Sequence, residues 1–305
     1  MPRVRANDIE IEYEILGDGG QPLLLIMGLG AQMIHWPDSL CRRFIDAGFQ
    51  LIRFDNRDVG KSTRFDDAGR VDFWGSFRRS LVGLPIDVPY LLSDMADDTA
   101  ALLESLGIDR AHVLGASLGG MIAQTLAIRH PARVLTLTSI MSTPGGRRFG
   151  LPTPKALRAL LRKPPKTREE SGEAVVQLFR TIGSPGFYRD EGILRDIGER
   201  SFDRGPSPAG MARQLGAVMA SGSRYKPLKH LDVPTLVIHG TEDPLIRPAA
   251  GRATARAIPN ARLEMIAGMG HDLAGGMWPI LLERVTDLVR GAGYELDRTS
   301  RAAKL

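Results

Sequence analysis

The sequence predicts an α/β fold with a mostly parallel β-sheet, and two patterns carry this prediction. Short, continuously apolar runs recur along the chain, as expected of strands that are buried on both faces of a sheet. Helical patterns separate most of these runs, and strands that alternate with helices form parallel sheets with right-handed crossovers. The apolar runs cover residues 23–27, 49–54, 112–114, 134–140, 235–238 and 263–266.

The chain before the first apolar run predicts a different kind of strand. Residues 9–15 alternate strictly between apolar and polar side chains, which is typical of a half-exposed antiparallel strand. The glycine-rich residues 17–20 supply its turn. The single cysteine, Cys41, lies in a helical pattern, so the sequence excludes an intramolecular disulfide and predicts a packed core thiol.

Two amphipathic helices have the clearest patterns. In residues 93–106 the apolar positions fall on one face, Ser93 is placed to cap the start, and Gly107 follows the end. A similar stripe predicts a helix near the carboxyl end of the chain. Its members are Leu281, Leu282, Val285, Leu288 and Val289.

The stretch between Thr143 and His230 contains no run that predicts a strand. It holds nine of the 20 prolines and four helical patterns, at about 155–162, 169–182, 189–200 and 208–220. We therefore expect a core of residues 1–143 and 231–305, interrupted by a helical cap of residues 144–230. Residues 147–168 carry eight basic residues and no acid, which predicts a solvated charged face, and residues 298–305 are expected to form a frayed tail.

Composition limits the classes of function. A net charge of +5 is small for 305 residues, so we expect no nucleic-acid partner. Residues 1–14 contain no signal-peptide apolar block, and no run approaches the roughly 18 apolar residues of a membrane-spanning helix, so we expect a cytoplasmic protein without an integral membrane segment. No histidine spacing or cysteine cluster is typical of a metal site. We expect a monomer or a homodimer.

The strongest functional pattern is Gly115-Ala116-Ser117-Leu118-Gly119, which directly follows the apolar run at 112–114. A helical pattern over 118–130, ended by Pro131, comes next. Flanking glycines permit a sharp turn from strand to helix, and such a turn exposes the serine hydroxyl beside helix-start amides. Ser117 is therefore a candidate nucleophile, although a purely structural tight turn would give the same pattern.

A serine hydroxyl needs a base within hydrogen-bond reach and an acid that orients the base. In an open parallel sheet these partners should follow the carboxyl ends of other strands. Asp243 follows the run at 235–238, and His271 follows the run at 263–266, so both are expected at the same sheet edge as Ser117. The neighbouring acids Glu242 and Asp272 remain alternatives to Asp243.

The remaining histidines have other expected roles. His112 and His239 lie in or at the end of strands, where packing is the expected role. His130 precedes Pro131 at a helix end, where a cation suits the helix dipole, and His35 is placed to approach the pocket.

Donors for a developing oxyanion are expected on two loops. Gly28-Leu29-Gly30 follows the run at 23–27, and Leu118 opens the helix after Ser117. We assign the backbone amides of Leu29 and Leu118 to this role. The same glycines would also serve a plain turn between strand and helix.

With these residues in place, the chain resembles the α/β-hydrolase superfamily from about residue 4 to residue 291. Residues 55–62 (DNRDVGKS) are similar to the D-x-R-x-x-G-x-S segment of that family, and the order Ser, Asp, His is the order of its triads. Residues 27–33 (MGLGAQM), followed by Trp36, are similar to a bacterial esterase branch that includes aclacinomycin methylesterase-like proteins. Many relatives carry His-Gly at the oxyanion loop, where this chain has Met27-Gly28.

The resemblance implies an eight-stranded, mostly parallel sheet with helices on both faces and a helical cap inserted after strand six. It also implies cofactor-free hydrolysis of a carboxylic ester through an acyl-serine intermediate, with a small-molecule ester as the partner. Thioesterase, lactonase and perhydrolase activities use the same triad, and a non-catalytic small-molecule receptor is the alternative from another class. Candidate pocket residues, each of which could equally hold the cap on the sheet, are Gly28, Met33, Trp36, Met141, Tyr188, Met211, Leu215 and Met219.

Overall fold

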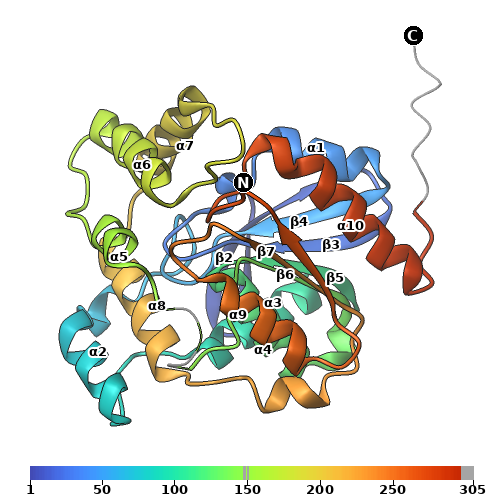
Figure 1. Ribbon diagram of the computed structural model, residues 1–305, viewed down its shortest axis with the longest axis horizontal. Coiled ribbons are helices and arrows are strands. Elements are labelled where there is room, and N and C mark those ends of the chain that lie inside the picture. Colours follow the sequence, from blue (N-terminus) through green and yellow to red (C-terminus); the bar gives the residue numbers. More distant parts are fainter. Residues whose placement is uncertain (147–148, 150, 297–305) are drawn as a thin grey trace.

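A computed structural model describes residues 1–146, 149 and 151–296, and Figure 1 shows a central sheet flanked by helices. The sheet has eight strands in the order β1-β2-β4-β3-β5-β6-β7-β8. β1 pairs antiparallel with β2, and β2 pairs antiparallel with β4, whereas all later pairings are parallel. The strands are β1 (Arg3–Ala6), β2 (Ile9–Leu16), β3 (Gln21–Ile26), β4 (Phe49–Phe54), β5 (Ala111–Ala116), β6 (Val134–Ile140), β7 (Thr235–Gly240) and β8 (Arg262–Ile266).

Helices cover both faces of the sheet (Figure 1). α1 (Asp38–Asp46) and α10 (Trp278–Gly291) pack on one face, where Leu23 and Leu25 of β3 point. α3 (Leu92–Ser105), α4 (Leu118–Arg129) and α9 (Pro248–Ala257) pack on the other face, where Leu24 and Ile26 point. Because successive side chains of a strand point to opposite faces, one apolar run supplies both cores.

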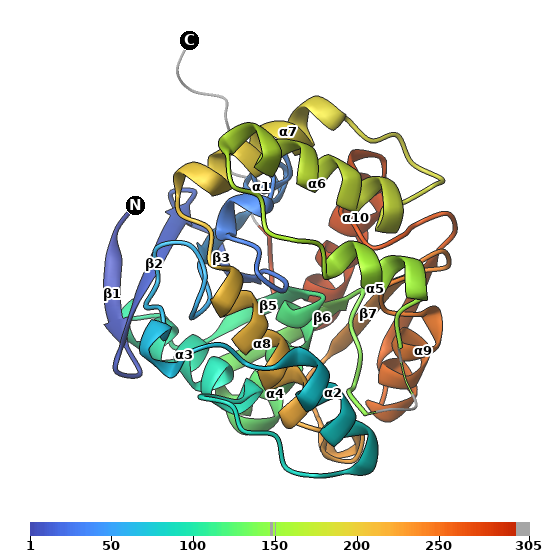
Figure 2. The ribbon, with the colours of Figure 1, turned by 90° about the vertical axis from the view of Figure 1, so that its left-hand side faces the viewer.

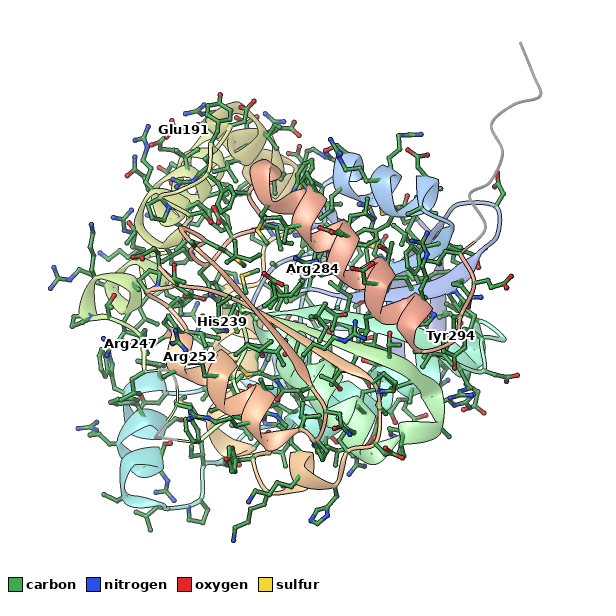
Figure 3. All side chains as sticks on the ribbon, turned by 45° about the vertical axis from the view of Figure 1, so that its right-hand side comes forward. Glu191, His239, Arg247, Arg252, Arg284 and Tyr294 are labelled. Carbon is green, nitrogen blue, oxygen red and sulfur yellow. The ribbon has the colours of Figure 1, made fainter. Side chains whose placement is uncertain are left out.

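Among the described residues between β6 and β7 there are four α-helices, which we call the cap helices. They are α5 (Pro154–Leu160), α6 (Arg168–Ile182), α7 (Glu191–Asp203) and α8 (Pro208–Ala220). Figure 2 shows them in front of the sheet. α6 and α7 pack against each other, and Arg180 pairs with Glu191 at 2.6 Å on the outer side of the cap, where Figure 3 labels Glu191.

Shorter elements complete the fold. α2 (Phe73–Val82) packs against α8, outside the predicted cap segment. The 3-10 helices are η1 (Met33–His35), η2 (Asp66–Ala68), η3 (Pro131–Arg133), η4 (Pro227–His230) and η5 (Gly275–Met277). No helix within the described residues is both long enough and apolar enough to cross a membrane.

The structure confirms the predicted α/β class and the mostly parallel sheet, and each predicted strand overlaps an observed one. The predicted cap at Ser93 is wrong. The helix begins at Leu92, so Ser93 lies within its first turn, and the N-cap residue is Leu91, two positions before Ser93. The backbone N–H of Leu91 donates to Asp94 Oδ2 at 2.7 Å. The division into core and cap at 143 and 231 stays a prediction.

Four further expectations concern Cys41, His130, the basic face and the carboxyl-terminal tail. Cys41 is buried on α1, as expected of a core thiol. His130, at the end of α4, bonds Asp97 Oδ1 at 2.7 Å. Residues 147, 148 and 150 of the predicted basic face, and the expected tail at 298–305, lie outside the described residues.

Candidate active site

Ser117 occupies a strained turn between β5 and α4. Its φ of 56° is rare for a residue with a side chain and costs about 1–3 kcal/mol, which interactions with the surroundings must offset. The Ser117 N–H donates to Ile140 O at 2.9 Å, and Ser142 Oγ donates to Ser117 O at 2.8 Å. A Cβ atom on Gly119 would lie 2.0 Å from Ile26 O, so only glycine lets α4 start this close to β3. The local packing therefore holds the serine in its strained conformation.

The structure brings together the three residues that the sequence singled out for proton transfer. Ser117 Oγ lies 3.0 Å from His271 Nε2, and His271 Nδ1 lies 2.7 Å from Asp243 Oδ2. An ionised carboxylate only accepts hydrogen bonds, so Nδ1 carries the proton and Nε2 is free to accept from the serine hydroxyl. The arrangement can move a proton from Ser117 to His271 while Asp243 stabilises the resulting imidazolium.

Asp243 is held in its ionised form from several sides. Burial by itself would raise the pKa of this carboxyl, but the imidazole of His271, which donates its Nδ1–H to Oδ2, lowers the pKa well below its usual value. Asp243 Oδ1 also accepts from the backbone N–H groups of Leu245 and Ile246, each at 2.9 Å. These contacts leave Oδ2 directed at the imidazole of His271.

His239 is a second imidazole on the same carboxylate. It is fully buried beside α9, in the interior where Figure 3 labels it. His239 Nε2 donates to Ile246 O at 2.7 Å and lies 3.5 Å from Asp243 Oδ2. The expected packing role of His239 therefore includes support for Asp243.

The two backbone amides assigned to the oxyanion, those of Leu29 and Leu118, both belong to segments beside Ser117. A Cβ atom on Gly28 would be 3.3 Å from Ser117 Cβ, so the Gly28–Leu29 peptide lies against the serine. Leu118 begins α4 directly after it. Within the described residues, neither Leu29 N–H nor Leu118 N–H donates to another protein group. Both amides are available to a ligand beside Ser117.

The alternative acids lie elsewhere. Glu242 is exposed. Asp272 accepts from both the backbone N–H and the hydroxyl of Ser184, in the loop between α6 and α7. Of these acids, only Asp243 has a carboxylate hydrogen-bonded to His271 in the part of the chain that the structure describes. In the same part, no three His, Cys, Asp or Glu side chains gather as they would around a metal ion.

The candidate pocket residues separate into three groups. Met33, Trp36 and Met141 are buried, and Trp36 has no exposed surface and packs in the core on the α1 side. Tyr188 is 82% exposed, so its side chain is not enclosed between cap and sheet as we expected. The remaining four lie on α8 or beside Ser117, namely Gly28, Met211, Leu215 and Met219.

His35 was expected to approach the pocket, but it bonds to the cap instead. Its Nε2 lies 3.0 Å from Ser201 Oγ of α7, and Ser201 donates its own proton to Ile197 O at 2.7 Å. Burial lowers the pKa of His35 to about 4, so this imidazole is neutral near pH 7.

Sequence reasoning missed the polar residues that hold the loops around Ser117 and His271. Asn56 Nδ2 donates to Met27 O at 3.0 Å, and Gln214 Oε1 accepts from Gly30 N–H at 2.9 Å. Ser184 Oγ accepts from Gly270 N–H at 2.9 Å. These partners are tens to almost two hundred residues apart, and no spacing rule in the sequence links them.

Comparisons with known proteins identify the family and the fold. Rhodomycin D methylesterase DnrP of Streptomyces peucetius is 31% identical over 297 residues, which cover 90% of this chain and 93% of that protein. A putative carbamate hydrolase, RutD of Variovorax paradoxus strain S110, is 25% identical and covers 86% of this chain and 89% of its own length. The enol-lactonase of Burkholderia xenovorans LB400 has a similar structure, with a TM-score of 0.69 at 23% identity over 95% of this chain and all of that chain.

A family model described as the alpha/beta hydrolase fold matches residues 21–183, a segment that includes β3, the Ser117 turn and α6. The eight-stranded sheet and the relative at 31% identity support the same family assignment. The chain therefore belongs to the alpha/beta hydrolase fold family.

Proposed function

We propose that this chain is a carboxylic ester hydrolase that works through an acyl-serine intermediate. The observation that carries the proposal is the continuous hydrogen-bonded line from Ser117 through His271 to Asp243, at 3.0 Å and 2.7 Å, with the serine on a strained turn. The methylesterase relative supports an ester substrate.

In the first half of the reaction, Ser117 Oγ attacks the ester carbonyl carbon while its proton passes to His271 Nε2. The amides of Leu29 and Leu118 donate to the carbonyl oxygen as it becomes negative. When the tetrahedral intermediate collapses, the bond to the alkoxy oxygen breaks, and His271 returns the proton to the departing alcohol.

In the second half, water attacks the acyl-serine, and His271 takes a proton from this water. Collapse then releases the carboxylic acid, and the proton returns to Ser117. Asp243 keeps the imidazole in the required tautomer throughout. Ser117, His271 and the attacking water account for every proton in these steps, so the proposal includes no cofactor and no metal.

The proposed substrate is a small-molecule carboxylic ester with an apolar acyl or alcohol part. Met211, Leu215 and Met219 supply apolar side chains from α8, and we place this helix, with the rest of residues 144–230, in a cap over the core. The similarity to a methylesterase makes methyl esters the first substrates to test.

Hydrolysis of a panel of esters tests the proposal. The panel holds short p-nitrophenyl esters, apolar methyl esters, acyl thioesters, lactones, and an acid with hydrogen peroxide for perhydrolysis. We expect esters to be preferred and Ser117→Ala to lower kcat by at least about 1,000-fold. Ser105→Ala, which removes an exposed hydroxyl bonded to Arg5 O, is the matched control and should stay active.

Three results would contradict the proposal in different ways. Turnover by Ser117→Ala would show that Ser117 is not the nucleophile. A clear preference for thioesters, lactones or perhydrolysis would keep the triad but change the substrate class. Binding of an ester with thermal stabilisation but without turnover would favour a small-molecule receptor.

A further inference from the structure

Gln214 joins α8 of the cap to the loop that carries the proposed oxyanion donor. Its side chain is fully buried. Oε1 accepts from Gly30 N–H at 2.9 Å, and Nε2 donates to Arg57 O at 2.8 Å. Both bonds require this orientation of the amide, because Gly30 N–H can only donate and Arg57 O can only accept. The side chain therefore bridges two core segments that follow neighbouring strands, β3 and β4.

The bond to Gly30 falls on the central peptide of a turn. Gly28 O accepts from Ala31 N–H at 3.2 Å, and Gly30 has a φ of +64° while Leu29 does not have a positive φ. This combination defines a type II turn, which differs from a type I turn by a flip of the central Leu29–Gly30 peptide. The Gln214 acceptor selects the type II orientation, because a flipped peptide would turn Gly30 N–H away from it.

The position of Gln214 is itself well determined. Its neighbour Arg213 is fully buried and forms hydrogen bonds to Asp58 at 2.7 Å and 2.8 Å. One turn earlier on α8, the Met211 side chain packs so closely on the turn that a Cβ atom on Gly30 would lie 3.0 Å from Met211 Cγ. Helix α8 is therefore docked firmly enough to position the turn.

We propose that Gln214 is a positioning residue for the oxyanion hole and that the hole is complete only while α8 of the cap is seated. The inference rests on the proposed function, because it assigns the Leu29 amide to the oxyanion. The Gly28–Leu29 peptide that carries this amide is one half of the turn, and the peptide that Gln214 holds is the next one. Loss of the acceptor frees the turn and moves the Leu29 amide relative to Ser117.

Loss of the Gln214 acceptor should destabilise the transition state more than it weakens substrate binding. A misplacement of about 1 Å in catalytic geometry can cost about 100-fold in rate. We therefore expect Gln214→Met, which keeps the side-chain volume but removes both hydrogen bonds, to lower kcat by about 10-fold to 100-fold. KM should change little, and the affinity for a boronic acid that forms an oxyanion adduct on Ser117 should fall with kcat.

Gln214→Glu is the rescue variant. Its carboxyl group can accept from Gly30 N–H, and in the neutral form it can also donate to Arg57 O. We expect it to recover most of the lost kcat, and to approach the wild type further as the pH is lowered and the carboxyl is protonated. Activity is compared with that of the wild type at each pH, so that the titration of other groups cancels.

Gln177→Met is the matched control, because it makes the same change on α6, where the Gln177 side chain donates to Glu173 Oε1 of its own helix at 2.6 Å and to no other group among the described residues. This variant should keep the wild-type kcat. Thermal melting checks folding, and hydrogen exchange of the Gly30 amide, measured by NMR, reports the turn directly. Exchange should be slow in the wild type and in Gln177→Met, and fast in Gln214→Met.

The outcomes separate the two proposals. An active wild type whose Gln214→Met variant keeps its kcat, or loses activity only through KM, overturns the role of Gln214 alone. Slow Gly30 exchange in that variant overturns it as well, because the turn would then not depend on Gln214. A folded wild type that neither hydrolyses any ester nor binds the boronic acid overturns the proposed function, and the role of Gln214 with it.

Discussion

Asp243→Asn is the most informative substitution at the site, because the surrounding backbone decides which way the new amide points. The N–H groups of Leu245 and Ile246 both donate to Asp243 Oδ1 at 2.9 Å. Only an oxygen can accept them, so the asparagine oxygen takes that place, and its NH₂ group replaces Oδ2 facing His271 Nδ1.

In this variant the neutral imidazole of His271 changes to its other tautomer. His271 Nδ1 must accept from the asparagine NH₂, so the ring proton moves to Nε2, which lies 3.0 Å from Ser117 Oγ. A protonated Nε2 cannot take the proton of Ser117. We expect kcat to fall by about 10,000-fold, which corresponds to about 5 kcal/mol in the transition state, with little change in KM.

The assay is steady-state hydrolysis of the best p-nitrophenyl ester, with thermal melting as the check on folding. Glu242→Gln is the matched control, because it makes the same change at the exposed neighbouring acid and should keep kcat within about twofold. An Asp243→Asn enzyme that keeps more than a tenth of the wild-type kcat would refute the reasoning from tautomers.

Further predictions concern the packing and the buried charges. Gly119→Ala should prevent native folding or strongly lower Tm, since its Cβ atom would lie 2.0 Å from a carbonyl oxygen of β3, whereas Gly275→Ala, with 3.9 Å to its nearest neighbour, should melt near the wild type. Arg213→Met leaves the buried Asp58 carboxylate unpaired and should cost about 3–5 kcal/mol in urea unfolding, and adding Asp58→Asn should recover part of this loss. Burial lowers the pKa of His35 to about 4 in the folded protein. As the pH falls below 6.5, His35 therefore takes up a proton in the unfolded chain before it does so in the folded one. His35 alone should therefore lower the free energy of unfolding by up to about 3 kcal/mol between pH 6.5 and 4, and His35→Gln should lose that part of the pH dependence.

The strands and helices that could be predicted are those with a clear local sequence pattern. Strands buried on both faces are rich in apolar residues, so β3 to β7 could be recognised one by one. β8 also lies where the sequence predicted a strand, but it is an edge strand whose first two residues are exposed, so it is not buried on both faces as expected. β1 could not, because Arg3–Ala6 is short and carries two arginines at an exposed edge. The placement of Asp243 and His271 beside Ser117 followed from topology, since the carboxyl ends of parallel strands meet at one edge of the sheet.

The pocket and the support of the loops could not be predicted in the same way. An aromatic residue near a site can line it, fill the core or face solvent, and the sequence does not distinguish Trp36, which is fully buried, from Tyr188, which is 82% exposed. Gln214 lies 184 residues from Gly30 along the chain, and a single glutamine in a helix carries no signal of its partner. Only the docking of α8 on the core brings these two residues together.

Covalent labelling with a fluorophosphonate tests the central claim most directly, because it reports whether the hydroxyl, the imidazole and the carboxylate act as one unit without requiring the natural substrate. Mass spectrometry of the digested protein should find one adduct, on Ser117, and labelling of His271→Ala should be slower by at least about 1,000-fold. An adduct on another residue, or equally fast labelling of His271→Ala, would contradict the account.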